Sequence, residues 1–384
     1  MTNDRESDHD LKRDPAIELA RFIGCLIVIG CHTYLSTKVN GQFDKCRLFF
    51  GMLFADGVAV FWLIGGAFLF NNTDYKRLLV RRTKQTLLPM LLVGLLYLLS
   101  AAYSDGNRSI RDLIVNEKER YLFFLKNLLL WRNGFPAYEH SWYIYVYMLL
   151  VLAFPALKGV VTYTDRAPKR KYVLVCGILA FLAINDLSRN QLASFDHHMF
   201  NGLSAAAFIT FIGYYLYQSR SFFQRKRYLV IAPAVFLMMN LTRETVQLHR
   251  ESAGYGDDIS IMYWYSVFGV TAASCILIFC IALIPNRRAT MCNKLICNVA
   301  SYTFPIYLIH VLIYRTLERT GLTGRLQNGI LAWNSGAAGE SVYMLLIVSC
   351  VFWSSFFVVY IFCLIYGVCM KHMRSQKNKG IPSP

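Results

Sequence analysis

The chain has 384 residues, of which 55% are hydrophobic and 16% are charged. Soluble domains carry about 25% charged residues, so this composition excludes an ordinary water-soluble enzyme, a disordered chain and a collagen-like chain, and it indicates a protein that lies in lipid. The formal net charge of +17 would suit a nucleic-acid-binding protein if the basic residues shared one soluble face, but they form short clusters between apolar runs, so we expect no nucleic-acid partner.

A helix of about 20 apolar residues crosses the ~30 Å hydrocarbon core of a bilayer. Ten apolar runs are long enough to be candidate spans: 16–34, 48–70, 86–103, 141–158, 172–187, 201–218, 228–242, 260–284, 298–314 and 340–370. We therefore predict an all-α polytopic membrane protein with about ten transmembrane helices. A membrane-embedded domain, 16–370, lies between a polar cytosolic tail, 1–15, and a basic cytosolic tail, 371–384. The stretch 121–131 is too short to cross and is typical of an interfacial or re-entrant helix.

The distribution of charge predicts how these spans are oriented. With alternating spans and both termini cytosolic, the cytosolic segments carry a net charge of +17 and the outer segments carry zero. Positive residues gather on the cytosolic side of membrane proteins, so we expect this topology in the cytoplasmic membrane of the cell. The longest outer loop, 104–140, is too short for a soluble catalytic domain, and any active site must be formed by the spans and their loops.

The first span carries three ionisable side chains. His32 follows Arg21 by eleven residues, which brings it within about 20° of the same helix face and about 16 Å along the axis. Glu18, three residues before Arg21, can pair with it. Ionisable residues inside a membrane are costly and are functional candidates. The alternative is a structural ion pair and a histidine at the interface.

The Arg-x10-His spacing in a first span resembles the signature of the acyltransferase 3 family of integral membrane O-acyltransferases. The order of the later segments is also similar to that family: 58–70 to its second span, 76–89 to its basic loop leading to a proline, 140–152 to its His-x-Trp entry to a span, and 301–310 to its Tyr-Leu-x-His motif. Two positions depart from the family. Gly65 stands where a serine is common, and Gln85 stands where a second arginine of the basic loop is expected.

The basic loop provides the candidate donor site, in which Arg81, Arg82 and Lys84 would meet the phosphates of acyl-coenzyme A. A cluster of this kind also arises simply from the orientation of the spans. The resemblance implies acyl-coenzyme A, most simply acetyl-coenzyme A, as a cytosolic co-substrate, and it implies no bound cofactor.

Histidines at the outer ends of spans are candidates for the acceptor side, because neutral imidazole suits general-base work. His32 is the candidate base, or it could itself carry the acyl group. His310 could orient His32, hold substrate or be an ordinary interface residue. His140 and Trp142 are candidates for the acceptor mouth, and Asp56 could pair with a histidine. No spacing typical of zinc ligands occurs, so we expect no metal.

Together with the resemblance, these residues predict an O-acyltransferase. It would move an acetyl or other short acyl group from cytosolic acyl-coenzyme A to a hydroxyl of a cell-surface polysaccharide or its lipid-linked precursor, with Arg21 and His32 as the catalytic residues. The alternative is a transporter or flippase for a lipid-linked sugar or a small solute. Transporters often contain internal repeats, and no repeat is evident here.

Overall fold

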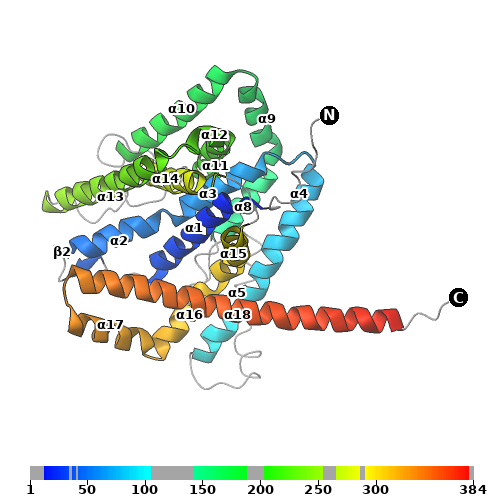
Figure 1. Ribbon diagram of the computed structural model, residues 1–384, viewed down its shortest axis with the longest axis vertical. Coiled ribbons are helices and arrows are strands. Elements are labelled where there is room, and N and C mark those ends of the chain that lie inside the picture. The colour runs from blue at the N-terminus through cyan, green and yellow to red at the C-terminus, as the bar shows by residue number, and fades with distance from the viewer. Residues whose placement is uncertain are drawn as a thin grey trace.

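The structure is a computed structural model that describes residues 13–33, 37–39, 42–104, 142–187, 203–253, 265–285 and 290–379. The described chain is a helical bundle (Figure 1), as the composition predicted. Its one departure is a hairpin of two-residue strands, β1 (Lys38–Val39) and β2 (Gln42–Phe43), which pair antiparallel. The predicted helix at 121–131 and the candidate residue His140 lie outside the described residues.

The first part of the chain supplies the centre of the bundle and its basic loop. Its helices are α1 (Pro15–Thr33), α2 (Lys45–Ala55), α3 (Gly57–Leu69), α4 (Tyr75–Arg82), the π-helix η2 (Thr83–Leu87) and α5 (Leu88–Ser104). The side chain of Asp44 caps α2 by accepting a hydrogen bond from the backbone N–H of Arg47, at 3.0 Å. Asp74 caps α4 in the same way. The predicted basic loop is therefore helical from its start, and it continues through η2 into α5.

The rest of the chain folds around this centre. Its helices are α8 (Trp142–Leu152), α9 (Phe154–Asp165), α10 (Pro168–Leu187), α11 (Leu203–Gln218), α12 (Arg220–Phe223), α13 (Tyr228–Ser252), α14 (Val267–Leu283), α15 (Met291–Ala300), α16 (Thr303–Arg319), α17 (Leu322–Trp333) and α18 (Ala337–Lys379). Two predicted spans are bent: α8 and α9 meet at 64°, and α15 and α16 meet at 54°.

Each of the ten predicted ranges contains a helix, but not every helix is long and apolar enough to cross a membrane alone. Among the described residues, four helices meet that criterion, and six segments do so when each bent pair counts as one span. The helix Val267–Leu283 is a shorter apolar helix. The membrane character of the chain is therefore supported, and the count of ten stays a prediction.

Close crossings hold the central helices together. A Cβ on Gly66 of α3 would overlap the backbone carbonyl of Thr210 in α11, and a Cβ on Gly213 would overlap the backbone of Leu63. Glycine at both positions lets the two backbones touch. Such small-residue contacts drive helix association in membranes, where apolar burial alone gives little advantage.

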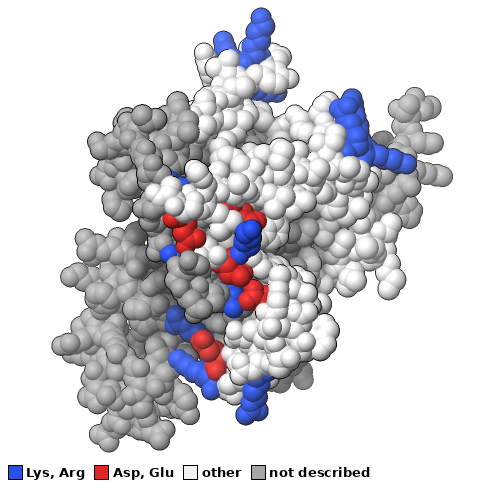
Figure 2. Space-filling model, turned by 90° about the vertical axis from the view of Figure 1, so that its left-hand side faces the viewer, with Lys and Arg blue, Asp and Glu red and all other residues white. Residues whose placement is uncertain are grey.

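The two ends of the bundle are tied together by different segments. At the end that contains α4, Arg220 pairs with Asp14 at 2.6 Å, just before α1 begins. At the end that contains the hairpin, Glu251 of α13 accepts the backbone N–H of Phe43, and Arg47 pairs with Glu340 at 2.7 Å. We call these the α4 end and the hairpin end; they lie at the right and left of Figure 1. Figure 2 faces the hairpin end and shows acidic and basic side chains interspersed there.

Candidate active site

Helix α1 carries the three ionisable residues that the sequence singled out. Glu18 and Arg21 lie in its first two turns, at the α4 end, and His32 lies in its last turn, at the hairpin end. A guanidinium nitrogen of Arg21 donates to both carboxylate oxygens of Glu18, at 2.6 and 2.8 Å, which confirms the predicted pair. Glu18 is buried and Arg21 is half-buried, so the pair is shielded from bulk water.

A cavity of about 320 Å³ lies beside this pair. Residues from the start of the chain, α1, α3, the α4–η2 segment, α8 and the α15–α16 break enclose it. Its lining residues are Arg13, Arg21, Phe61, Ile64, Gly65, Phe68, Leu69, Arg82, Gln85, Thr86, Tyr143, Tyr147, Ala300, Ser301, Thr303, Phe304 and Tyr307. Helices far apart in the sequence therefore converge on one pocket, and its volume is within the range of small-molecule sites.

Cations dominate the charged lining of the cavity. Arg13, Arg21 and Arg82 line it, and Arg21 has the carboxylate of Glu18 as its partner. The Nε of Arg82 is buried and has no hydrogen-bond partner among the described residues, while its guanidinium lies 6.0 Å from the ring of Tyr147. A buried donor without a partner is costly and suits an anion that arrives from outside.

The other members of the predicted donor cluster lie elsewhere. Arg81 is exposed, and its Nε donates to the side-chain oxygen of Gln85 at 3.3 Å. Lys84 is exposed as well, and neither Arg81 nor Lys84 is among the described residues that line the cavity. Gln85, the departure from the family pattern, does line it. The structure thus brings Arg82, but not its neighbours, together with Arg21.

Aromatic rings form one wall of the cavity. Tyr147 and Tyr143 stack with ring centroids 6.4 Å apart, and Tyr143 lies 5.8 Å from Tyr307. Trp62 packs on Tyr143 from behind at 4.2 Å, and Trp142 contacts the same ring at 6.4 Å. The predicted acceptor-side residue Trp142 therefore packs against this wall but is not among the described residues that line the cavity. The rings form a continuous series of contacts from Arg82 to α16.

This series of ring contacts ends at the two histidines. The ring of His310 lies 5.9 Å from that of Tyr307 and 5.2 Å from that of His32. His310 is fully buried, and its Nδ1 lies 2.7 Å from the backbone carbonyl of Tyr307. A carbonyl only accepts, so Nδ1 carries the proton, and the Nε2 of a neutral His310 is left as an acceptor. His32 is exposed, as a residue that meets an incoming substrate must be.

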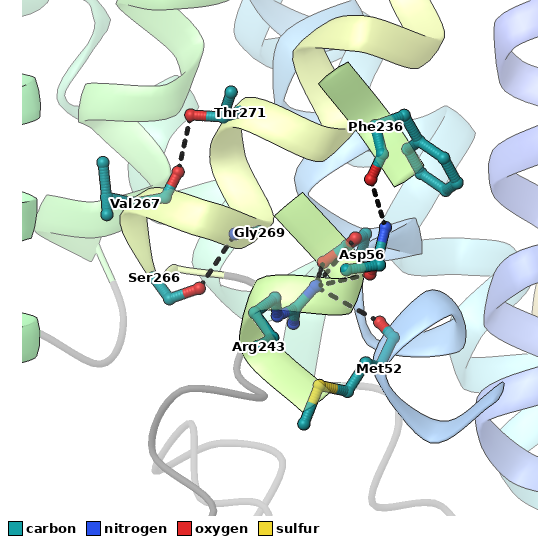
Figure 3. A network of polar contacts seen from close by, with 9 residues as sticks. Met52, Asp56, Phe236, Arg243, Ser266, Val267, Gly269 and Thr271 are labelled. Atoms are coloured by element: carbon teal, nitrogen blue, oxygen red, sulfur yellow. Dashed lines mark hydrogen bonds and ion pairs between the residues drawn. The ribbon is translucent and has the colours of Figure 1, made fainter. Parts of the chain in front are cut away.

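Asp56, which could have paired with a histidine, pairs instead with an arginine among the described residues. Both Asp56 and Arg243 of α13 are completely buried, and a guanidinium nitrogen of Arg243 donates to both carboxylate oxygens at 2.9 and 3.0 Å (Figure 3). The same nitrogen lies 3.1 Å from the side-chain oxygen of Asn240. Asp56 sits at the junction of α2 and α3, where the chain turns its side chain toward α13.

Sequence reasoning missed several of these residues. Tyr143 and Tyr147 are four residues apart, a spacing that places two rings on one helix face, so a signal was present. Arg13 was assigned to a polar tail, and Tyr307 was seen only as part of a motif. The role of Arg243 had no local signal, because its partner is 187 residues away.

The described chain is a helical bundle of membrane character, with a cationic, aromatic cavity and a pair of histidines that contact its wall through Tyr307. These features define a membrane-embedded protein with an internal polar site. The comparison with known families gives the particular family: the model of an acyltransferase domain, that of the acyltransferase 3 family, matches residues 14–368. The chain therefore belongs to this family of membrane acyltransferases. No curated protein and no solved structure matches it.

Proposed function

We propose that the protein takes an acetyl or other short acyl group from cytosolic acyl-coenzyme A and transfers it to a hydroxyl of a cell-surface polysaccharide or its lipid-linked precursor, within the cytoplasmic membrane. The observation that carries the proposal is a series of ring contacts that joins the cationic cavity to His32. Arg82 and Arg21 lie at one end of this series and His310 and His32 lie at the other, with Tyr307 between them.

The cavity at the α4 end suits the donor. Phosphate groups carry several negative charges, and charge-assisted hydrogen bonds from guanidinium groups are about twice as strong as neutral ones. Arg13 and Arg82 are available for this role, while Arg21 is held in place by Glu18. The long thioester arm of coenzyme A could then lie along the tyrosine rings, with the acyl group near His32.

The chemistry at the other end needs a base. His32 would accept the proton of the acceptor hydroxyl as its oxygen attacks the thioester carbonyl; the carbon–sulfur bond breaks, and the thiolate of coenzyme A takes up a proton. Alternatively, Nε2 or Nδ1 of His32 attacks first and the acyl group passes from the imidazole to the hydroxyl. In both routes His310 is the positioning residue that lies against the His32 ring.

The test uses purified protein in sealed vesicles, with isotopically labelled acetyl-coenzyme A on the side of the α4 end and polysaccharide on the other. We expect covalent label on the polysaccharide. His32→Ala and His32→Gln should each lower transfer by about 10²–10⁴-fold at normal protein abundance, because a positioned base typically contributes that much. More than a tenth of the normal rate in either variant would contradict the assignment of His32. Solute movement without covalent label would favour a transporter instead.

A further inference from the structure

A second cavity lies on the opposite face of α1 from Arg21 and His32. It has a volume of about 490 Å³ and is enclosed by α1, α2, α13, α14 and α18. Its lining residues are Ile23, Leu26, Ile27, Leu53, Phe54, Ala232, Pro233, Phe236, Cys275, Ile276, Phe279, Leu345, Val348 and Ser349. None of these side chains is charged, so the cavity does not suit the acyl donor and serves the proposed reaction in no direct way.

The position of this cavity along α13 gives its depth in the membrane. Ala232 and Phe236 lie four and eight residues beyond Tyr228, where the helix begins, which corresponds to about 6–12 Å. The outward face of α13 is apolar and exposed: Val230 is 72% exposed and Leu237 is 47% exposed. A groove at this depth, beside a face of this kind, is in contact with hydrocarbon chains and not with water.

A cationic turn precedes α13. Arg225, Lys226 and Arg227 are consecutive and exposed, and none of them forms an ion pair among the described residues. The guanidinium groups of Arg225 and Arg227 lie 4.8 and 5.3 Å from the ring of Phe222, which holds them at the surface of the turn. The turn is fixed against the residues that follow α14, since the side-chain amide of Gln224 donates to the backbone carbonyl of Pro285 at 2.7 Å.

We propose that this turn and the apolar cavity form one binding site for an anionic phospholipid. The phosphate would lie on Arg225, Lys226 and Arg227, and one acyl chain would enter the cavity past Ala232 and Phe236. Basic residues beside a membrane surface attract anionic lipids. The distance from the turn to the cavity along α13 suits a phosphate at the interface and a chain in the hydrocarbon core. The cation cluster, and not the apolar cavity alone, selects an anionic lipid as the occupant.

The test is photo-crosslinking in vesicles, with two probes that carry the same diazirine-labelled chain. One probe has a phosphatidylglycerol headgroup and the other a phosphatidylcholine headgroup. We expect several-fold higher capture of the anionic probe, with the label on peptides of α13 and α14. Replacing Arg225 and Arg227 together by Gln should lower this capture by about fivefold per charge removed and leave the zwitterionic probe unchanged. Arg166→Gln with Lys169→Gln, two exposed cations at the junction of α9 and α10, is the matched control.

Filling the cavity tests the chain-binding half of the site. Ala232→Phe should lower capture of both probes in the cavity. Ser349→Phe should do the same, and because Ser349 is an exposed lining residue, its larger ring can be accommodated without disturbing the buried core. Ile231→Phe, on the exposed face next to Ala232, should leave capture unchanged. Equal capture of the two headgroups, indifference to the cavity variants, or displacement by a polyprenyl phosphate in preference to phosphatidylglycerol would overturn the proposal. Capture needs no acyl-coenzyme A, so its failure is distinct from a failure of the proposed acyl transfer.

Discussion

Tyr307 is the residue at which the two halves of the candidate active site meet. Its ring belongs to the wall of the cationic cavity, and its backbone carbonyl holds the Nδ1 of His310 at 2.7 Å. His310 follows it by three residues on α16, so the helix itself sets the distance between the cavity wall and the histidine. A substrate that displaces the Tyr307 ring would therefore also change the position of the His310 side chain.

His310 can be tested as a positioning residue. His310→Phe keeps a ring of similar size but removes the polar contacts, and we expect the turnover rate to fall by about 10²-fold, as a small misplacement of a catalytic group does. The KM for acyl-coenzyme A should change little, because the cationic cavity is intact. Steady-state kinetics over a range of pH separate these terms. His249→Asn, at an exposed histidine of α13, serves as the control. A changed KM with a normal turnover rate would refute the positioning role.

Arg82 and Arg81 offer a matched pair for the donor site. Arg82→Gln removes a half-buried cation of the cavity and should raise the KM for acyl-coenzyme A by about tenfold or more, the cost of losing one hydrogen bond to a charged group. Arg81→Gln should have little effect, because this exposed side chain turns toward Gln85. The measurement is the initial rate as a function of acyl-coenzyme A concentration. Equal effects of the two variants would indicate that the loop only attracts the donor through its net charge.

Local spacing was enough to predict part of this site. Glu18 and Arg21 share one helix, so three residues of separation fix their contact. Arg81 and Arg82 cannot be separated in this way. Which of two adjacent arginines faces the cavity depends on the rotation of α4, and the π-helix η2 that follows it changes the rotation in a manner that no residue pattern in the loop announces.

At the scale of the elements, α3 presents two adjacent glycines with opposite requirements. A Cβ on Gly65 would meet nothing within 4 Å, because this residue faces the cavity, whereas a Cβ on Gly66 would overlap the backbone of α11. We expect Gly65→Ala to leave the free energy of unfolding nearly unchanged. Gly66→Ala should lower the free energy of unfolding by about 1–3 kcal/mol, the usual cost of overpacking. Thermal unfolding in detergent measures both. A stable Gly66→Ala variant would contradict the close crossing of α3 and α11.

The buried pair of Asp56 and Arg243 joins the α2–α3 junction to α13. Asp56→Asn leaves a buried guanidinium without its counter-charge, so we expect a loss of about 3–5 kcal/mol of stability. Asp56→Leu combined with Arg243→Met should recover much of this loss, since apolar replacement of both partners is often neutral. Arg47→Gln, at the partly exposed pair with Glu340, should cost less than Asp56→Asn, because water can still reach the carboxylate that is left without its partner. Thermal unfolding of the four proteins tests the ranking; equal losses for Asp56→Asn and Arg47→Gln would contradict it.

The elements themselves were largely predictable, and their bends were not. Runs of apolar residues identified a helix in each of the ten ranges. The break before α9 accompanies Pro155, which occupies one of the first two positions of that helix, where its missing N–H costs nothing. Pro233 in contrast lies inside the continuous helix α13. The same residue type thus ends one helix and is tolerated in another, according to whether neighbouring groups compensate for the lost hydrogen bond.

At the scale of the whole molecule, the distribution of charge predicts the orientation of the chain in the membrane. The segments that meet at the α4 end include the basic loops, and those at the hairpin end carry mixed charge (Figure 2). We expect reporter fusions after residues 75, 166, 223 and 290 to read as cytosolic, and fusions after residues 106, 190, 254 and 325 to read as external, because positive loops stay inside. An alkaline phosphatase and fluorescent protein pair reports both sides. If two or more reporters read on the opposite side, the proposed sides of the membrane for donor and acceptor would be wrong.

Helix α1 fixes the distance between the two ends of the candidate active site. Arg21 and His32 belong to one unbroken helix, and their separation of about 16 Å along its axis cannot shorten without unwinding it. A donor whose phosphates stay near Arg21 must therefore carry its acyl group on a long arm to reach His32. Acetyl phosphate, in which the acyl carbon is bonded directly to the phosphate oxygen, is too short to span that gap. The fixed length of this one helix would then determine which acyl donors of the cell can react, because only a donor with a long enough arm reaches His32. This selection requires no contact between the helix and the acyl group.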